Sequence, residues 1–227
     1  MKSRNLILHL IFLVIAVVQL YGSWIESRTL EYIAKPLILL WIAVFFLLNT
    51  RPAARRWLVV LAFFFSWIGD LLLMFAWKND LFFFAGVGSF FCSQVTYILV
   101  FLTYRLAPGR GLIQLKPVWV IPFILYFGLL YSILLPDLEG MMIPVVSIYA
   151  VTLIGMSIAA VNRHGRVKNR EFVLVMSGAL MFLVSDSLLA INKFVTEIPR
   201  GGFLVILTYI AAQYLIMRGL AGECKDD

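Results

Sequence analysis

Residues 57–77 read WLVVLAFFFSWIGDLLLMFAW, and residues 171–191 read EFVLVMSGALMFLVSDSLLAI. Both runs are long and apolar enough to cross a lipid bilayer as an α-helix. Each carries one aspartate near its end, Asp70 in the first and Asp186 in the second. A carboxylate inside a membrane costs several kcal/mol unless it is paired, solvated or protonated, so it indicates a functional site. Of the twelve Asp and Glu residues, we expect the other ten to lie in loops or at the C-terminus.

The composition places the chain among membrane proteins. Hydrophobic residues make up 63% of its 227 residues and charged residues only 14%, more apolar material than a soluble domain of this size can bury. The net charge of +7 does not indicate nucleic-acid binding, because the basic residues lie in short segments between apolar runs. The two histidines, His9 and His164, lie far from the aspartates in the expected topology, so we expect no metal site and no cofactor.

Eight apolar runs of spanning length follow one another along the chain. They cover residues 5–24, 35–48, 57–77, 81–104, 117–135, 141–161, 171–191 and 203–220. We therefore expect an all-α fold, a polytopic bundle of eight transmembrane helices in one integral membrane domain spanning 1–227. The first run resembles a signal peptide but has no clear cleavage site before Trp24, so we expect it to be retained.

The basic residues predict the orientation of this bundle. If the spans alternate in direction, fourteen of the nineteen Lys and Arg residues lie on the side of the N-terminus. The five on the other side are Arg28, Lys35, Lys78, Lys193 and Arg200. The positive-inside rule then places both termini in the cytoplasm, and we expect the membrane to be the cell (inner) membrane.

The same topology relates the two aspartates. Asp70 lies thirteen residues beyond Trp57, and Asp186 lies fifteen beyond Glu171. At 1.5 Å per residue, each carboxylate lies roughly 20 Å along a helix that runs outward from the cytoplasm. We expect the two side chains to face one cavity from adjacent helices.

Other residues repeat in step with the aspartates. Gln94 follows Asp70 by 24 residues, Gln213 follows Asp186 by 27, and a proline opens the second and the sixth spans (Pro36 and Pro144). These pairs suggest a parallel four-plus-four duplication of helices. Chance similarity among leucine-rich helices remains an equal alternative.

Polar side chains in or beside the spans are candidates for lining a substrate cavity around the aspartates. These candidates are Lys35, Ser66, Gln94, Tyr97, Tyr149, Ser185, Asn192, Lys193, Tyr209 and Gln213. Each one has a simpler alternative: the uncharged groups can join two helices by a hydrogen bond, and the lysines can extend to the membrane surface. A single buried aspartate can likewise serve only to hold two helices together.

Several short motifs occur together in a characteristic order. They are Lys35-Pro36-Leu37, Gly69-Asp70-x-Leu72-Leu73, Pro144-Val145 with Tyr149, Ser185-Asp186 with Leu189 and Asn192-Lys193-Phe194, and Gln213-x-Leu215-Ile216. In this order and spacing the chain resembles the YhhN family of integral membrane lysoplasmalogenases. It departs from some members at Ser93-Gln94-x-x-Tyr97, where they carry Ser-His-x-x-Tyr, so no imidazole is available at that position.

The resemblance implies hydrolysis of the vinyl ether bond of a lysoplasmalogen, a lysophospholipid, to a fatty aldehyde and a glycerophospho-base. Two carboxylates suit this chemistry, because one can protonate carbon while the other stabilises the oxocarbenium ion and deprotonates water. Which aspartate is the acid stays open at this point.

Two other functions fit a pair of membrane aspartates. A proton-coupled membrane carrier is the main alternative, because duplicated bundles with central acids are typical of transporters. An intramembrane aspartyl protease is less compatible, because the two spans run parallel and the chain lacks the Pro-Ala-Leu signature that such proteases carry.

Overall fold

The computed structural model describes residues 2–52, 54–103 and 109–223, and its regular structure is helical throughout these ranges. The helices are α1 (Lys2–Trp24), α2 (Arg28–Asn49), α3 (Ala54–Leu73), α4 (Asp80–Thr103), α5 (Leu112–Leu115), α6 (Ile121–Leu134), α7 (Met142–Val161), α8 (Asn169–Phe194) and α9 (Gly201–Glu223). Short 3₁₀ turns at Pro117–Val120 and Leu135–Asp137 extend α6 at its two ends.

Within the residues that the structure describes, eight helical segments are long and apolar enough to span a membrane, as predicted from hydropathy. The chain is therefore an integral, multi-pass membrane protein. Two boundaries differ from the prediction by four or more residues when the 3₁₀ turns are counted with α6. Helix α2 begins at Arg28 rather than at Lys35, so Glu31 lies in a helix and not in a loop. Helix α3 ends at Leu73, which leaves Trp77 beyond the helix.

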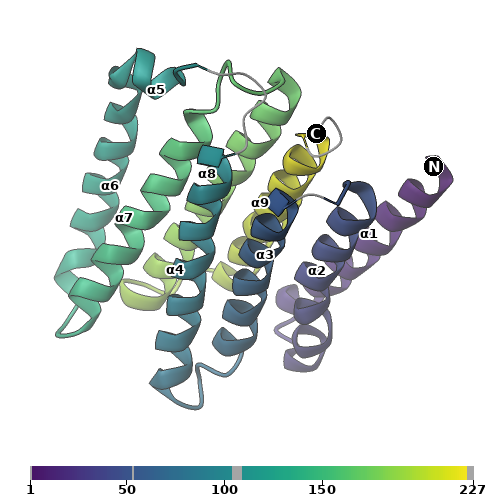
Figure 1. Cartoon of the computed structure of the whole chain (residues 1–227). Coiled ribbons are helices and arrows are strands. Elements are labelled where there is room, and N and C mark those ends of the chain that lie inside the picture. The colour runs from purple at the N-terminus through teal and green to yellow at the C-terminus, as the bar shows by residue number, and fades with distance from the viewer. Residues whose placement is uncertain (1, 53, 104–108, 224–227) are drawn as a thin grey trace.

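Six of the helices form a closed ring in which each packs on the next. The order around the ring is α2, α3, α4, α7, α8, α9 and back to α2. Helix α1 packs outside the ring against α2 and α9, and α6 packs outside it against α7 and α8, at opposite edges of the bundle (Figure 1). Helices α2 to α4 and α7 to α9 each form three consecutive members of the ring, but α1 contacts α9 of the other half whereas α6 contacts α8 of its own half, so the four-plus-four repeat stays a prediction.

Small residues bring the ring helices close together beside the aspartates. A Cβ atom on Gly69 of α3 would lie 2.6 Å from the ring of Phe90 in α4. A Cβ atom on Gly178 of α8 would lie 2.8 Å from the carbonyl oxygen of Ala212 in α9. Close approach through small residues is the usual way in which membrane helices pack, and here it fixes the two helices that carry the aspartates.

The centre of the ring is filled by aromatic side chains from three helices. The ring centroids of Phe90, Phe182 and Tyr209 lie 5.8–6.3 Å apart in edge-to-face pairs. These geometries are favourable for aromatic pairs. The bundle is therefore packed at this level.

Both chain termini lie at one end of the bundle, and the segments 25–27, 74–79 and 195–200 lie at the other (Figure 1). Asp70 lies three residues before the end of α3, and Asp186 lies eight before the end of α8. Both aspartates therefore lie in the half of the bundle away from the termini.

Candidate active site between two connected cavities

Asp70 is held by side chains from two other helices. The residue is only 3% exposed. The hydroxyl of Tyr209 in α9 donates a hydrogen bond to Oδ2 at 2.8 Å. The ammonium group of Lys35 in α2 lies 3.6 Å from Oδ1. Asp70 therefore has a positively charged partner.

Asp186 has a different set of partners. The hydroxyl of Tyr149 in α7 donates to Oδ2 at 2.5 Å, and Nε2 of Gln94 in α4 donates to the same oxygen at 3.2 Å. Among the described residues, no side chain donates to Oδ1 and no cation pairs with this carboxylate. Asp70 and Asp186 do act on each other electrostatically. The pair is thus asymmetric, with one member neutralised by a cation and the other not.

The aspartates lie at matched depths, but their helices are not close packing partners. Asp70 is sixteen residues from the start of α3, and Asp186 is seventeen from the start of α8. Helix α3 packs mainly on α2 and α4, whereas α8 packs mainly on α7 and α9. The expectation of adjacent helices was therefore wrong, and Asp70, unlike Asp186, lines none of the pockets found among the described residues. Phe90 connects the two positions, because it contacts Gly69 and lines a pocket with Asp186.

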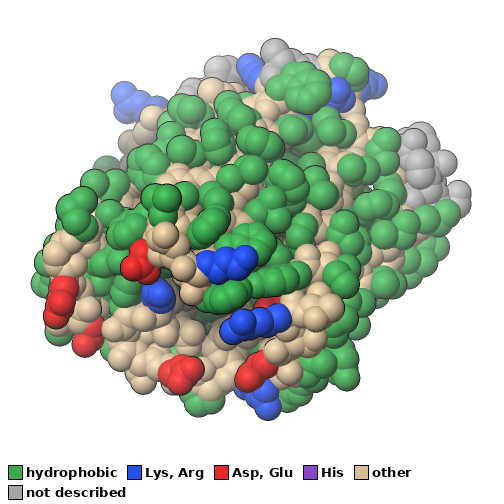
Figure 2. Space-filling view, turned by 90° about the horizontal axis from the view of Figure 1, so that it is seen from below, with side chains coloured by type: hydrophobic (Ala, Val, Ile, Leu, Met, Phe, Trp, Pro, Cys, Tyr) green, Lys and Arg blue, Asp and Glu red, His purple; other side chains and the backbone are tan. Residues whose placement is uncertain are grey.

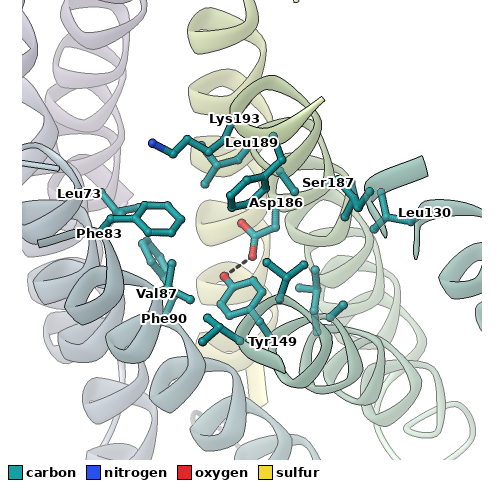
Figure 3. A pocket seen from close by; sticks show the side chains of 17 residues that line it. Leu73, Phe83, Val87, Phe90, Leu130, Tyr149, Asp186, Ser187, Leu189 and Lys193 are labelled. Carbon is teal, nitrogen blue, oxygen red and sulfur yellow. Dashed lines mark hydrogen bonds between the residues drawn. The ribbon is translucent and has the colours of Figure 1, made fainter. Parts of the chain in front are cut away.

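This pocket, the apolar pocket, is a narrow slot of about 60 Å³. Its walls come from α3, α4, α6, α7 and α8. The residues that line it are Leu73, Phe83, Val87, Phe90, Leu130, Leu134, Val145, Val146, Tyr149, Ala150, Leu153, Asp186, Ser187, Leu189, Ala190, Lys193 and Phe194. Figure 3 shows the Asp186 carboxylate pointing into it, with Tyr149 on one side and the aromatic rings of α4 opposite. A mostly apolar lining with a few polar groups is the composition of a small-molecule site, but this pocket is smaller than the roughly 300–1,000 Å³ that is usual for such sites.

A second space, the polar cavity, lies toward the end of the bundle away from the termini. It has a volume of about 290 Å³, and its charged lining residues are Arg28, Glu31 and Lys35 of α2. It shares Arg28 and Glu31 with a wider outer cavity of about 730 Å³. Figure 2 looks onto this end and shows basic and acidic side chains gathered around a hollow.

Two leucines join the apolar pocket to the polar cavity. Leu73 and Leu189 line both spaces. Each follows its aspartate by three residues, about one helical turn. The repeated Asp-x-x-Leu spacing therefore places each carboxylate one turn inside the boundary between a polar and an apolar space.

The model of the YhhN family matches residues 30–220, which is most of the chain. The chain belongs to the YhhN family. Among curated proteins, it is 30% identical over 207 residues to the lysoplasmalogenase TMEM86A of Bos taurus, which covers 85% of this chain and 80% of the bovine protein. The Homo sapiens TMEM86A gives the same identity and coverage. The lysoplasmalogenase TMEM86B of Sus scrofa is 32% identical over 160 residues, 70% of this chain and 62% of the relative. No solved structure matches the chain.

Some predicted site residues of this YhhN protein do lie at the cavities. Tyr149 and Lys193 line the apolar pocket, where the ammonium group of Lys193 lies 5.1 Å from the centre of the Phe83 ring. Lys35 and Asn192 line the polar cavity. The side-chain oxygen of Asn192 also accepts a hydrogen bond from the backbone of Ile198, so it shapes the α8–α9 connection.

Other predicted residues are engaged away from the two spaces. Tyr97 donates to Gln213 at 2.5 Å, and Gln213 donates in turn to Ser66 at 3.1 Å. Ser185 donates to the backbone of Val205 in α9. None of these four side chains lines the apolar pocket or the polar cavity. In this YhhN fold they join helices, which was the simpler alternative for each.

Glu31 was not among the predicted site residues, although it lines the polar cavity. We placed it in a loop because the apolar run begins four residues later. Its spacing from Lys35 was the available signal, because residues four apart share one face of a helix. Once α2 begins at Arg28, Glu31 lies one turn outward from Lys35 on the cavity wall.

Proposed function

We propose that this protein is a lysoplasmalogenase, which hydrolyses the vinyl ether bond of a lysoplasmalogen to a fatty aldehyde and a glycerophospho-base. One observation carries the proposal: a buried carboxylate, Asp186, opens into an apolar slot one helical turn from a charged cavity. A lysoplasmalogen has the same order of chemistry, with a hydrocarbon chain, then the vinyl ether, then a charged head group. The names of the relatives support the same reaction.

The two spaces suggest how the substrate is placed. The alkenyl chain occupies the apolar pocket, and the glycerophospho-base occupies the polar cavity. Leu73 and Leu189 then flank the glycerol backbone, because they line both spaces. The vinyl ether comes to rest beside the aspartates, one turn further in.

The different partners of the two carboxylates suggest their roles. Asp70 contacts Lys35 and serves as the carboxylate that stabilises positive charge. Asp186 has no cationic partner in the described parts of the chain, and both of its hydrogen bonds end on Oδ2. Oδ1 is thereby left to carry the proton. We therefore assign Asp186 as the general acid.

The reaction then proceeds without a redox step. Asp186 transfers its proton to the second carbon of the alkenyl chain, and the first carbon becomes an oxocarbenium ion shared with the ether oxygen. Water bonds to that first carbon and gives a proton to the carboxylate pair. The resulting hemiacetal breaks its bond to the glycerol oxygen, which takes the hydroxyl proton and leaves as an alcohol. One water is consumed, and the cation is stabilised by nearby carboxylates as in glycosidases.

Gln94 supplies a position for the attacking water. Its Nε2 contacts Asp186, while its Oε1 is buried and has no hydrogen-bond partner within the described residues. A buried amide oxygen without a partner is costly. Water bound there would satisfy this oxygen and lie beside the carboxyl group that it must reach.

Aldehyde release from purified protein in detergent tests the proposal. We expect wild-type protein to cleave an alkenyl lysophospholipid and to leave the acyl analogue, which lacks the vinyl ether, intact. The same protein in proteoliposomes tests the carrier. Counterflow of a solute with no chemical turnover would support the carrier and contradict the hydrolase.

A further inference from the structure

The polar cavity carries an arrangement of charges that the hydrolysis itself does not require. Arg28, Glu31 and Lys35 follow one another on one face of α2, from the mouth of the cavity inward. Lys35 already contacts Asp70, and the guanidinium group of Arg28 lies 5.1 Å from the centre of the Trp77 ring. A single acid thus lies between two cations on the wall.

The carboxylate of Glu31 is the unexplained member of this set. It is partly buried and lines both the polar cavity and the outer cavity. Its carboxylate makes no ion pair or hydrogen bond with any residue that the structure describes. By contrast, Glu26, at the rim of the outer cavity, lies 3.6 Å from Arg200. A partly buried charge without a partner is unfavourable, so Glu31 is available to a cationic ligand.

We propose that Glu31 is a specificity-determining residue that binds the amine of the substrate's head group. The inference rests on the proposed function. The phosphate lies against Lys35 and Arg28, and the ammonium group pairs with Glu31. Side chains three or four residues apart on a helix have Cβ atoms about 5–6 Å apart, a separation that the two-carbon linker of choline or ethanolamine can span. The protein therefore prefers lysoplasmalogens with a cationic base to those that end in a bare phosphate.

The test compares two substrates on three proteins. Wild type, Glu31→Gln and Glu197→Gln each receive an alkenyl lysophospholipid with a choline head and one with only a phosphate. Glu197 is the matched control, because it is an acid that lines the outer cavity but not the polar cavity. We expect Glu31→Gln to lower the choline-to-phosphate ratio of kcat/KM about tenfold, mainly through KM, and Glu197→Gln to leave it within about twofold.

Two results would overturn the proposal. One is a wild-type enzyme that cleaves the phosphate form as well as the choline form. The other is a Glu31→Gln variant that loses both activities equally, which would indicate a structural role. If wild type cleaves neither substrate, the proposed function fails, but the head-group claim is still tested by binding. The quantity to measure is then the ratio of the Kd for lysophosphatidic acid to the Kd for acyl lysophosphatidylcholine. We expect this ratio to be about tenfold larger for wild type than for Glu31→Gln. Equal ratios in the two proteins would contradict the claim.

Discussion

The ammonium group of Lys35 lies 3.6 Å from Oδ1 of Asp70, at the boundary between the polar cavity and the buried interior. The contact joins the wall of the head-group cavity to one member of the aspartate pair. It also makes the pair unequal, because Asp186 is held by two neutral donors instead. The division of roles in the proposed reaction follows from this difference.

Removing the Lys35 charge should therefore impair catalysis. In Lys35→Met, Asp70 loses its cationic partner and is left buried without charge compensation, so we expect kcat for aldehyde release to fall about 10²-fold. Lys78→Met is the control, because Lys78 is exposed at the same end and lines neither space. Adding Asp70→Asn to Lys35→Met should restore thermal stability but not activity. If Lys35→Met alone kept normal turnover, the proposed role of Asp70 in the reaction would be contradicted.

Tyr149 and Tyr97 should respond differently to loss of their hydroxyls. Tyr149→Phe removes a donor that stabilises the carboxylate formed as Asp186 gives up its proton, and hydrogen bonds to charged groups contribute about 1.5–3 kcal/mol, so kcat should fall at least about tenfold. Tyr97→Phe removes a donor to Gln213 away from both spaces, so it should lower the melting temperature while kcat stays within about twofold. Steady-state kinetics and thermal unfolding of both variants check this contrast. Equal kinetic effects would contradict the assignment of the apolar pocket as the reaction site.

Filling the apolar pocket should discriminate against long chains. Ala190 lines the pocket, and Ala190→Phe places a ring in the path of the alkenyl chain. We expect kcat/KM to fall about tenfold or more for a long-chain substrate and less for a short-chain one. Val151→Phe is the control, because Val151 is 58% exposed on the outside of α7. Identical losses of kcat/KM for the long-chain and short-chain substrates would indicate that the alkenyl chain does not bind in the apolar pocket.

The described residues form an even number of candidate spans, and the two ends of the chain lie at one end of the bundle in Figure 1, so we expect both termini on one side of the membrane. We predict that this side is the cytoplasm, because fourteen of nineteen basic residues belong to it. A reporter that is active only in the cytoplasm should be active when fused after Asp227 and inactive when inserted after Asn79. A reporter that is active only outside the cytoplasm should show the reverse. The opposite pattern would show that the orientation is the reverse of the predicted one and that the polar cavity faces the cytoplasmic leaflet.

Hydropathy predicted the number of spans and the matched positions of the aspartates, because both depend on local sequence. It misplaced the start of α2, because Glu31 reads as a loop residue and Lys35 as the first residue of the span, although both side chains line a polar cavity within the bundle. The sequence also could not order the helices around the ring. That order depends on contacts between distant segments, such as Gly178 against Ala212.

The polar residues within the spans show the same limit. Tyr149 and Tyr97 are both tyrosines in membrane helices, yet one contacts Asp186 and the other contacts Gln213. Spacing alone does not separate these cases, because a buried hydroxyl takes whichever acceptor the packing brings near it. The two cavities, and the leucines that join them, likewise exist only once five or more helices are assembled.

The central claim is that Asp70 and Asp186 act together on the vinyl ether bond. The most direct test is kcat for aldehyde release by Asp70→Asn, Asp186→Asn and the double variant, all purified and shown to be folded. Asn keeps the size of Asp and part of its hydrogen bonding but cannot serve as acid or base. We predict a loss of about 10² to 10⁴ in each single variant, no rescue by added metal, and a double variant little worse than either. If either single variant kept more than about a tenth of wild-type turnover, that carboxylate would be structural and the paired mechanism would be wrong.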